Sequence, residues 1–131
     1  KGSAAPGATE TPYISADAFL NNIKGEWYDN TIKDAGPHLK IQEPNVEAGL
    51  LWLGSKWYEY RYRVESVSRD GKSGTIEAYK MNYYKFTSGG HEKIEIDVAP
   101  PDVYTYNSEN NTITKYRYNS DSVQTTIYTR Q

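Results

Sequence analysis

Apolar and polar residues alternate along most of the chain from residue 26 onward, and this alternation predicts β-strands. The clearest case is the segment 56–68, where Tyr58, Tyr60 and Tyr62 alternate with Glu59 and Arg61. Side chains at every second position of an extended chain lie on the same face of a sheet. The segment therefore predicts a long strand with one tyrosine-rich face and one charged face.

The other expected strands lie between turns rich in Gly, Pro, Asn and Asp. They cover residues 26–32, 38–42, 46–53, 73–86, 91–98, 103–106, 112–118 and 123–130. Asp70-Gly71 is typical of a tight hairpin turn. The alternation slips near Ala78-Tyr79, which predicts a β-bulge. Pro100-Pro101 is expected to break the sheet, because proline cannot donate a ladder hydrogen bond.

A short helix is expected before the first strand. Ser15 is a suitable N-terminal cap, Phe19, Leu20 and Ile23 form one apolar side, and Gly25 is expected to end the helix. A helix of about two turns is too short to be stable alone, so we expect it to dock on one end of the sheet. Closing a meander of this length removes its exposed edges. The prediction is an all-β fold: a single antiparallel up-and-down barrel of about eight strands with a short N-terminal helix.

Composition adds that tyrosine must supply much of the buried surface. The chain has 13 Tyr and 3 Trp but only 2 Phe and 1 Met, and buried phenols need hydrogen-bond partners. The net charge of −2 gives no reason to expect nucleic acid or an anionic membrane as a partner. The absence of cysteine excludes disulfides and thiol catalysis.

The segment Lys1–Pro12 is small, polar and rich in Pro and Gly, and it predicts a flexible linker. Such tethers often follow the anchoring cysteine of a bacterial lipoprotein, although the remnant of an expression tag would look the same. The chain starts at Lys1 without a methionine, so we expect a processed or truncated start. The expected location is outside the cytoplasm, secreted or anchored at the cell surface, with membrane contact only through an N-terminal lipid anchor.

The segment from Phe19 to Tyr28 resembles the start of a lipocalin or another member of the calycin group. Gly25, Trp27 and Tyr28 match the Gly-x-Trp that heads the first strand in that family. The resemblance implies that residues 13–131 form a diverged lipocalin-like barrel domain whose closed end is built around Gly25 and Trp27. It also implies an Arg packed on the Trp ring, with Arg130 the best match by position and Arg117 the second. A cation over an indole contributes roughly 0.5–2 kcal/mol.

The expected function is binding of a small apolar or amphipathic ligand, without chemical change, in a tyrosine-lined cavity of a monomer. The candidate ligand-binding residues are Tyr58, Tyr60, Tyr62, Tyr104, Tyr106, Tyr116, Tyr118 and Trp52. For any single one of these tyrosines a structural role is the more common one, because Tyr is a favoured strand residue.

Two other classes of function remain open. The first is a surface module that recognises glycan or protein through exposed aromatic residues. An exposed Trp52 would favour such binding. The second is an enzyme, for which no catalytic residue is assigned. His91, Glu95 and Asp97 share one strand face and resemble metal ligands, but a charged strand face opposite an apolar one is usually solvated. No metal and no cofactor are expected.

Overall fold

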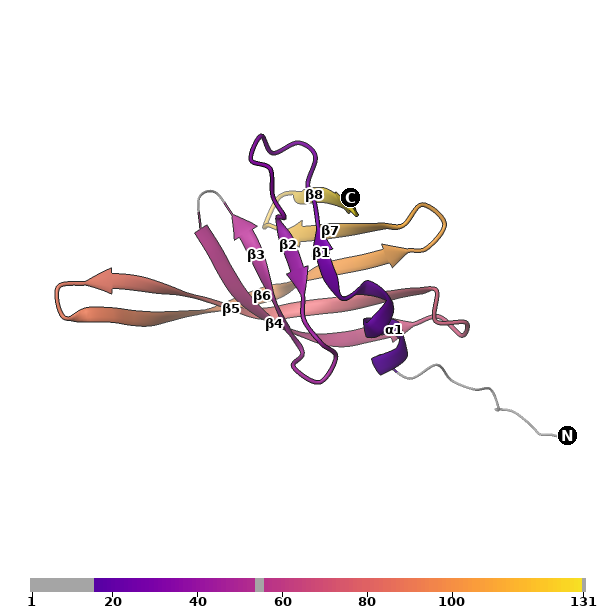
Figure 1. The fold of residues 1–131 in the computed structure, drawn as a ribbon, viewed down its shortest axis with the longest axis horizontal. Helices are drawn as coiled ribbons and strands as arrows, with labels where there is room; N and C mark the ends of the chain where they lie inside the picture. Colours follow the sequence, from indigo (N-terminus) through magenta and orange to yellow (C-terminus); the bar gives the residue numbers. More distant parts are fainter. Residues whose placement is uncertain (1–15, 54–55, 131) are drawn as a thin grey trace, which may run out of the picture.

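The computed structural model describes residues 16–53 and 56–130. The predicted linker Lys1–Pro12 and the predicted cap Ser15 lie outside these residues. Within them, one short helix precedes eight strands (Figure 1). The elements are α1 (Ala16–Ile23), β1 (Gly25–Trp27), β2 (Leu39–Ile41), β3 (Ala48–Leu53), β4 (Lys56–Val67), β5 (Ser73–Thr87), β6 (Gly90–Asn107), β7 (Thr112–Tyr118) and β8 (Val123–Thr129).

The eight strands form one antiparallel sheet in which neighbours in the chain are neighbours in the sheet. The sheet curls into a nearly closed barrel, because Tyr28, just after β1, pairs with Thr129 of β8. The Tyr28 amide donates to the Thr129 carbonyl at 2.7 Å, and the Thr129 amide donates back at 2.9 Å. The predicted fold class is confirmed. No helix in the described ranges is long and apolar enough to cross a membrane.

The strand predicted over residues 26–32 is much shorter than expected. After β1 and the Tyr28 bridge, the chain enters a loop that runs to His38. The buried His38 ring holds this loop: its Nδ1 accepts from the Asp29 amide at 3.0 Å, and its Nε2 lies 3.0 Å from the Asp34 carbonyl. These local side-chain contacts replace ladder hydrogen bonds and end the strand early.

The predicted sheet break at Pro100-Pro101 is wrong, because β6 runs without interruption from Gly90 to Asn107. The ladder with β5 jumps from the pair Ala78–Asp102 to the pair Lys80–Asp97. Residues 98–101 therefore face only Tyr79 and need no regular ladder bonds. This bulge accommodates two residues that lack an N–H group. The bulge predicted near Ala78-Tyr79 is confirmed.

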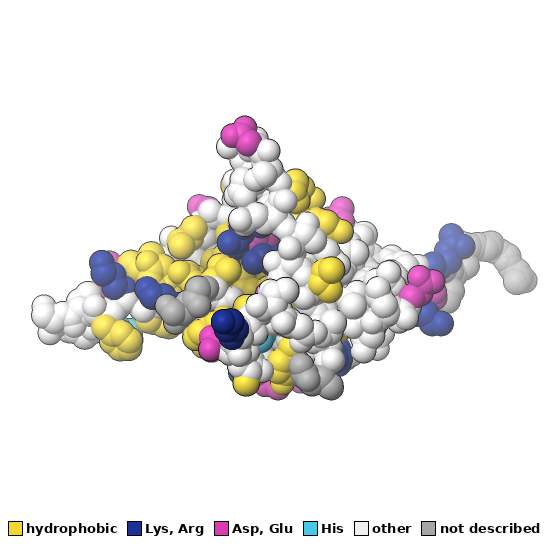
Figure 2. All heavy atoms as spheres, turned by 90° about the horizontal axis from the view of Figure 1, so that it is seen from above, with side chains coloured by type: hydrophobic (Ala, Val, Ile, Leu, Met, Phe, Trp, Pro, Cys, Tyr) yellow, Lys and Arg dark blue, Asp and Glu magenta, His cyan; other side chains and the backbone are white. Residues whose placement is uncertain are grey.

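The two halves of the β5–β6 hairpin differ in their surroundings. Pairing with β4 ends at Asn82, so residues 83–87 and 90–94 pair only with each other. We call residues 83–94 the arm. It extends well beyond the barrel (Figure 1), and hydrophobic side chains gather where it leaves the barrel (Figure 2).

One end of the barrel is closed by α1 and Trp27. Phe19, Leu20 and Ile23 of the helix are buried, and the Trp27 Nε1 donates to the Ile23 carbonyl at 2.8 Å. The Arg130 guanidinium carbon lies 4.3 Å from the centroid of the Trp27 ring. Its Nη2 also donates to the Asn22 carbonyl at 2.6 Å. This is the packing that the lipocalin resemblance implies for Trp27 and a late arginine.

Candidate functional site

Aromatic rings fill the middle of the barrel. Tyr60, Tyr62 and Tyr104 are all essentially inaccessible to solvent. The rings of Tyr60 and Tyr104 stack with centroids 5.7 Å apart, and the Tyr60 hydroxyl donates to the Lys40 carbonyl at 3.1 Å. Burial raises the pKa of both hydroxyls well above the ordinary value for tyrosine. These three side chains fill the core of the barrel, so a ligand could enter only at its open end.

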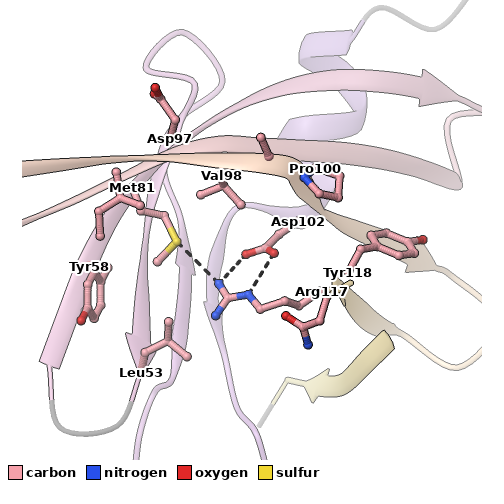
Figure 3. A pocket seen from close by; sticks show the side chains of 12 residues that line it. Leu53, Tyr58, Met81, Asp97, Val98, Pro100, Asp102, Arg117 and Tyr118 are labelled. Atoms are coloured by element: carbon pink, nitrogen blue, oxygen red, sulfur yellow. Dashed lines mark hydrogen bonds and ion pairs between the residues drawn. The ribbon is translucent and has the colours of Figure 1, made fainter. Parts of the chain in front are cut away.

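The open end contains a cavity of about 370 Å³ (Figure 3). This volume is within the usual range for small-molecule sites, roughly 300–1,000 Å³. Apolar side chains from four neighbouring strands, β3 to β6, form one wall: Leu53, Tyr58, Met81 and Val98. Asp102 and Arg117 face this wall. The cavity therefore combines an apolar surface with one strong polar group.

Asp102 and Arg117 form a bidentate ion pair. The arginine Nη2 lies 2.6 Å from Asp102 Oδ2, and its Nε donates to Oδ1 at 3.0 Å. The Asp102 side chain is 1 % exposed, whereas that of Arg117 is 26 % exposed and reaches the cavity surface. The register of β6 and β7 places the two residues opposite each other, since Val103 pairs with Tyr116. The hydrogen bond to Asp102 raises the pKa of Arg117 further.

Lys115 is a second inward-facing cation on β7. It is only 4 % exposed and lies opposite Tyr104 on β6. Burial, and to a smaller extent the Arg117 charge, lowers the pKa of Lys115 to about 8. No described residue forms a hydrogen bond or an ion pair with its ammonium group. The interior next to the cavity therefore contains two cations and the Asp102 carboxylate.

The structure separates the candidate residues identified in the sequence. Tyr58 and Tyr118 line the cavity. Tyr106 contacts Trp27 near the closed end, with ring centroids 6.0 Å apart, and Tyr116 is half-buried on β7. Trp52 lies outside the barrel, in a groove described below. A ligand-binding role for any of these residues remains a prediction.

Sequence analysis missed three polar residues in or next to the cavity. It gave no role to Asp102 or Lys115, and considered Arg117 only as a second partner for the Trp27 ring. A signal was present in β7. Lys115 and Arg117 lie at every second position after the apolar Ile113, so all three side chains are on the same face of the strand. Charged residues on an otherwise core-facing register indicate a polar interior.

The candidate metal ligands do not come together. No group of three or more His, Asp or Glu side chains suited to a metal ion occurs within residues 16–53 and 56–130. His91 is on the arm, where its ring packs against Tyr84 and Phe86 at centroid distances of 5.2 and 6.2 Å.

Comparison with known proteins does not assign a family to the chain. No family model, no curated protein and no solved structure matches it. The function must therefore be argued from the site itself.

Proposed function

We propose that this chain is a diverged lipocalin-like protein that binds a small amphipathic molecule in the open end of its barrel, without chemical change. The observation that carries the proposal is the cavity of about 370 Å³ with an apolar wall and the Arg117 guanidinium facing it. The lipocalin resemblance, a monomeric state and a location outside the cytoplasm belong to the same proposal.

The apolar part of the ligand is expected to lie against Leu53, Met81 and Val98, where it would lose contact with water. The mostly filled barrel centre limits the depth of entry, because the stacked rings of Tyr60 and Tyr104 close the path inward. A ligand that occupies the mouth rather than the full barrel fits this arrangement.

The polar part of the ligand is expected to bind Arg117. Asp102 takes the Nε and one Nη2 bond of this side chain, while Nη1 has no hydrogen-bond partner among the described residues. A guanidinium has five N–H donors, so donors remain for a ligand oxygen. Asp102 keeps the guanidinium in place, and the buried Lys115 adds positive charge nearby. A carboxylate, sulfonate or other hydrogen-bond acceptor is therefore the favoured polar group.

The test is a fluorescence titration with two probes of similar shape. The anionic probe 1-anilinonaphthalene-8-sulfonate is expected to bind more tightly than the neutral N-phenyl-1-naphthylamine, because only the former offers an acceptor to Arg117. Val98→Phe replaces a small aliphatic side chain with an aromatic ring that fills part of the cavity. It is expected to weaken binding of both probes by about tenfold or more.

Val46→Phe is the matched control. Val46 is an exposed residue in the turn between β2 and β3, and it does not line the cavity. Its variant should bind both probes like the unchanged protein. The proposal would be contradicted if neither probe bound the unchanged protein, or if the Val98→Phe variant bound both probes with the affinity of the unchanged protein.

A further inference from the structure

A second concave site lies on the outside of the barrel. Leu51 and Leu53 of β3 and Tyr58 of β4 face inward, so alternation places Trp52 and Trp57 on the outer face. With the loop that precedes β2, they line a groove of about 460 Å³. We call it the indole groove and define it by Asp34, Pro37, Lys40, Trp52 and Trp57.

The two tryptophans are cross-strand partners at the end of β3 and β4. Their ring centroids are 5.4 Å apart at an interplanar angle of 66°. Both are half-buried, and neither belongs to the hydrophobic core. Two large aromatic rings on the outer face of a barrel, facing a groove, are a typical feature of a binding surface.

Polar groups of opposite charge flank these rings. The Lys40 ammonium lies 5.2 Å from the centroid of the Trp57 ring. Asp34 is exposed at the rim, and its carboxylate makes no hydrogen bond or ion pair with any described residue. The loop that carries it is fixed, because the buried His38 ring contacts the Asp34 carbonyl. The groove therefore offers an acceptor, a donor and aromatic surface within one small volume.

We propose that the indole groove binds a saccharide. A sugar ring has a face of polarised C–H groups, which suits the electron-rich face of an indole. Its hydroxyls lie around the edge of the ring, and each can both donate and accept a hydrogen bond. One sugar residue would lie on Trp52, with its hydroxyls bound to the Asp34 carboxylate and the Lys40 ammonium. This site is separate from the cavity and does not depend on the function proposed for it.

The three tryptophans of the chain make the test selective. Trp27 is buried under Arg130 near the closed end, whereas Trp52 and Trp57 line the groove. We suggest titrating the ¹⁵N-labelled protein with soluble chito-, cello-, malto- and manno-oligosaccharides and following the three indole N–H resonances. At least one oligosaccharide is expected to shift the Trp52 and Trp57 signals while that of Trp27 stays unchanged.

Variants identify the contacts. Trp52→Ala and Asp34→Asn are each expected to weaken binding of that oligosaccharide by about tenfold or more. Phe86→Ala, which removes an exposed aromatic ring on the arm, should leave it unchanged. Val98→Phe in the cavity should also leave it unchanged, so failure of one site is distinguishable from failure of the other.

Three outcomes would overturn the proposal. The first is that no oligosaccharide moves the Trp52 or Trp57 signals at millimolar concentration. The second is unchanged affinity in the variant that combines Trp52→Ala with Trp57→Ala. The third is that a proline-rich peptide moves the two signals and no sugar does, which would make the groove a peptide site.

Discussion

At the scale of single residues, the charged groups inside the barrel set how its stability depends on pH. Most of the interior is aromatic or aliphatic, and Lys115 is a cation placed within it at 4 % exposure. Its environment lowers its pKa from 10.5 to about 8. In the folded protein the charged form is therefore destabilised relative to the neutral form by roughly 3 kcal/mol. This residue is therefore costly to stability at neutral pH.

Stability is expected to rise with pH between about 8 and 10. In this range the unfolded chain still holds the Lys115 proton while the folded protein has released it, so the free energy of unfolding increases with pH. Above pH 10 the trend reverses, because Tyr62, whose pKa is raised to about 12, ionises first in the unfolded chain. Urea denaturation across this pH range measures both slopes.

Lys115→Met isolates the contribution of the lysine. The variant is expected to be more stable than the unchanged protein by up to roughly 3 kcal/mol at pH 7, with the difference vanishing above pH 10.5. Lys85→Met, on the exposed arm, is the control and should follow the pH profile of the unchanged protein. Equal stability of the Lys115→Met and unchanged proteins at pH 7 would show that the buried Lys115 charge does not destabilise the fold.

At the scale of elements, close backbone packing joins β2, β3 and β4. Gly49 of β3 pairs with Ile41 on one side and Tyr60 on the other. The Tyr60 ring lies over Gly49 to reach the Lys40 carbonyl, so the position has no room for a side chain. The phenol hydrogen bond in the barrel centre therefore depends on a glycine in the neighbouring strand.

Gly49→Ala is expected to destabilise the barrel by at least about 2 kcal/mol. Its Cβ would collide with the Lys40 carbonyl and with the Tyr60 ring, and the colliding backbone atom cannot move aside without disturbing the sheet. Gly89→Ala is the matched control in the turn of the arm, where a Cβ meets no atom within 4 Å, and it should change stability by less than about 0.5 kcal/mol. Urea denaturation at neutral pH would show the contrast, and a Gly49→Ala variant as stable as the control would argue against this packing.

How far the sequence predicted each element depended on the range of the interactions. The helix over Phe19, Leu20 and Ile23 and the bulge at Tyr79 follow from local patterns, and both are present. The continuous β6 could not be predicted, because the prolines are tolerated only through a bulge in the ladder with β5. The pair Asp102–Arg117 was missed for a similar reason: the alignment of two strands brings together residues that are unremarkable separately.

At the scale of the whole molecule, the structure is a barrel with one projecting hairpin. Ile94 and Ile96 alternate with charged residues, a pattern typical of a strand with one apolar face, yet Ile96 is exposed in the structure. Ile96 pairs with Met81 of β5, but β6 pairs with β7 only from Val103 onward, so no described strand pairs with the other side of Ile96. No pattern within the hairpin itself carries that information.

The arm is expected to open independently of the barrel. A two-stranded hairpin without a third strand is only marginally stable in water, so its amides should exchange with solvent through local opening. Hydrogen exchange followed by NMR should show much lower protection for ladder amides in 83–94 than for those of β4 and β5 that pair within the barrel. Equal protection in both regions would show that the arm shares the cooperative unit of the barrel.

The exposed turn at Ser88-Gly89 divides the chain into two parts, and a cut there would break no strand. One fragment would carry α1 and β1 to β5, and the other β6 to β8, while the long β5–β6 ladder and the Arg130 contact with α1 would hold them together. Two separately produced fragments cut at this turn should thus reassemble into the same barrel. The fold offers a natural site for fragment complementation, or for a new chain start in a permuted protein.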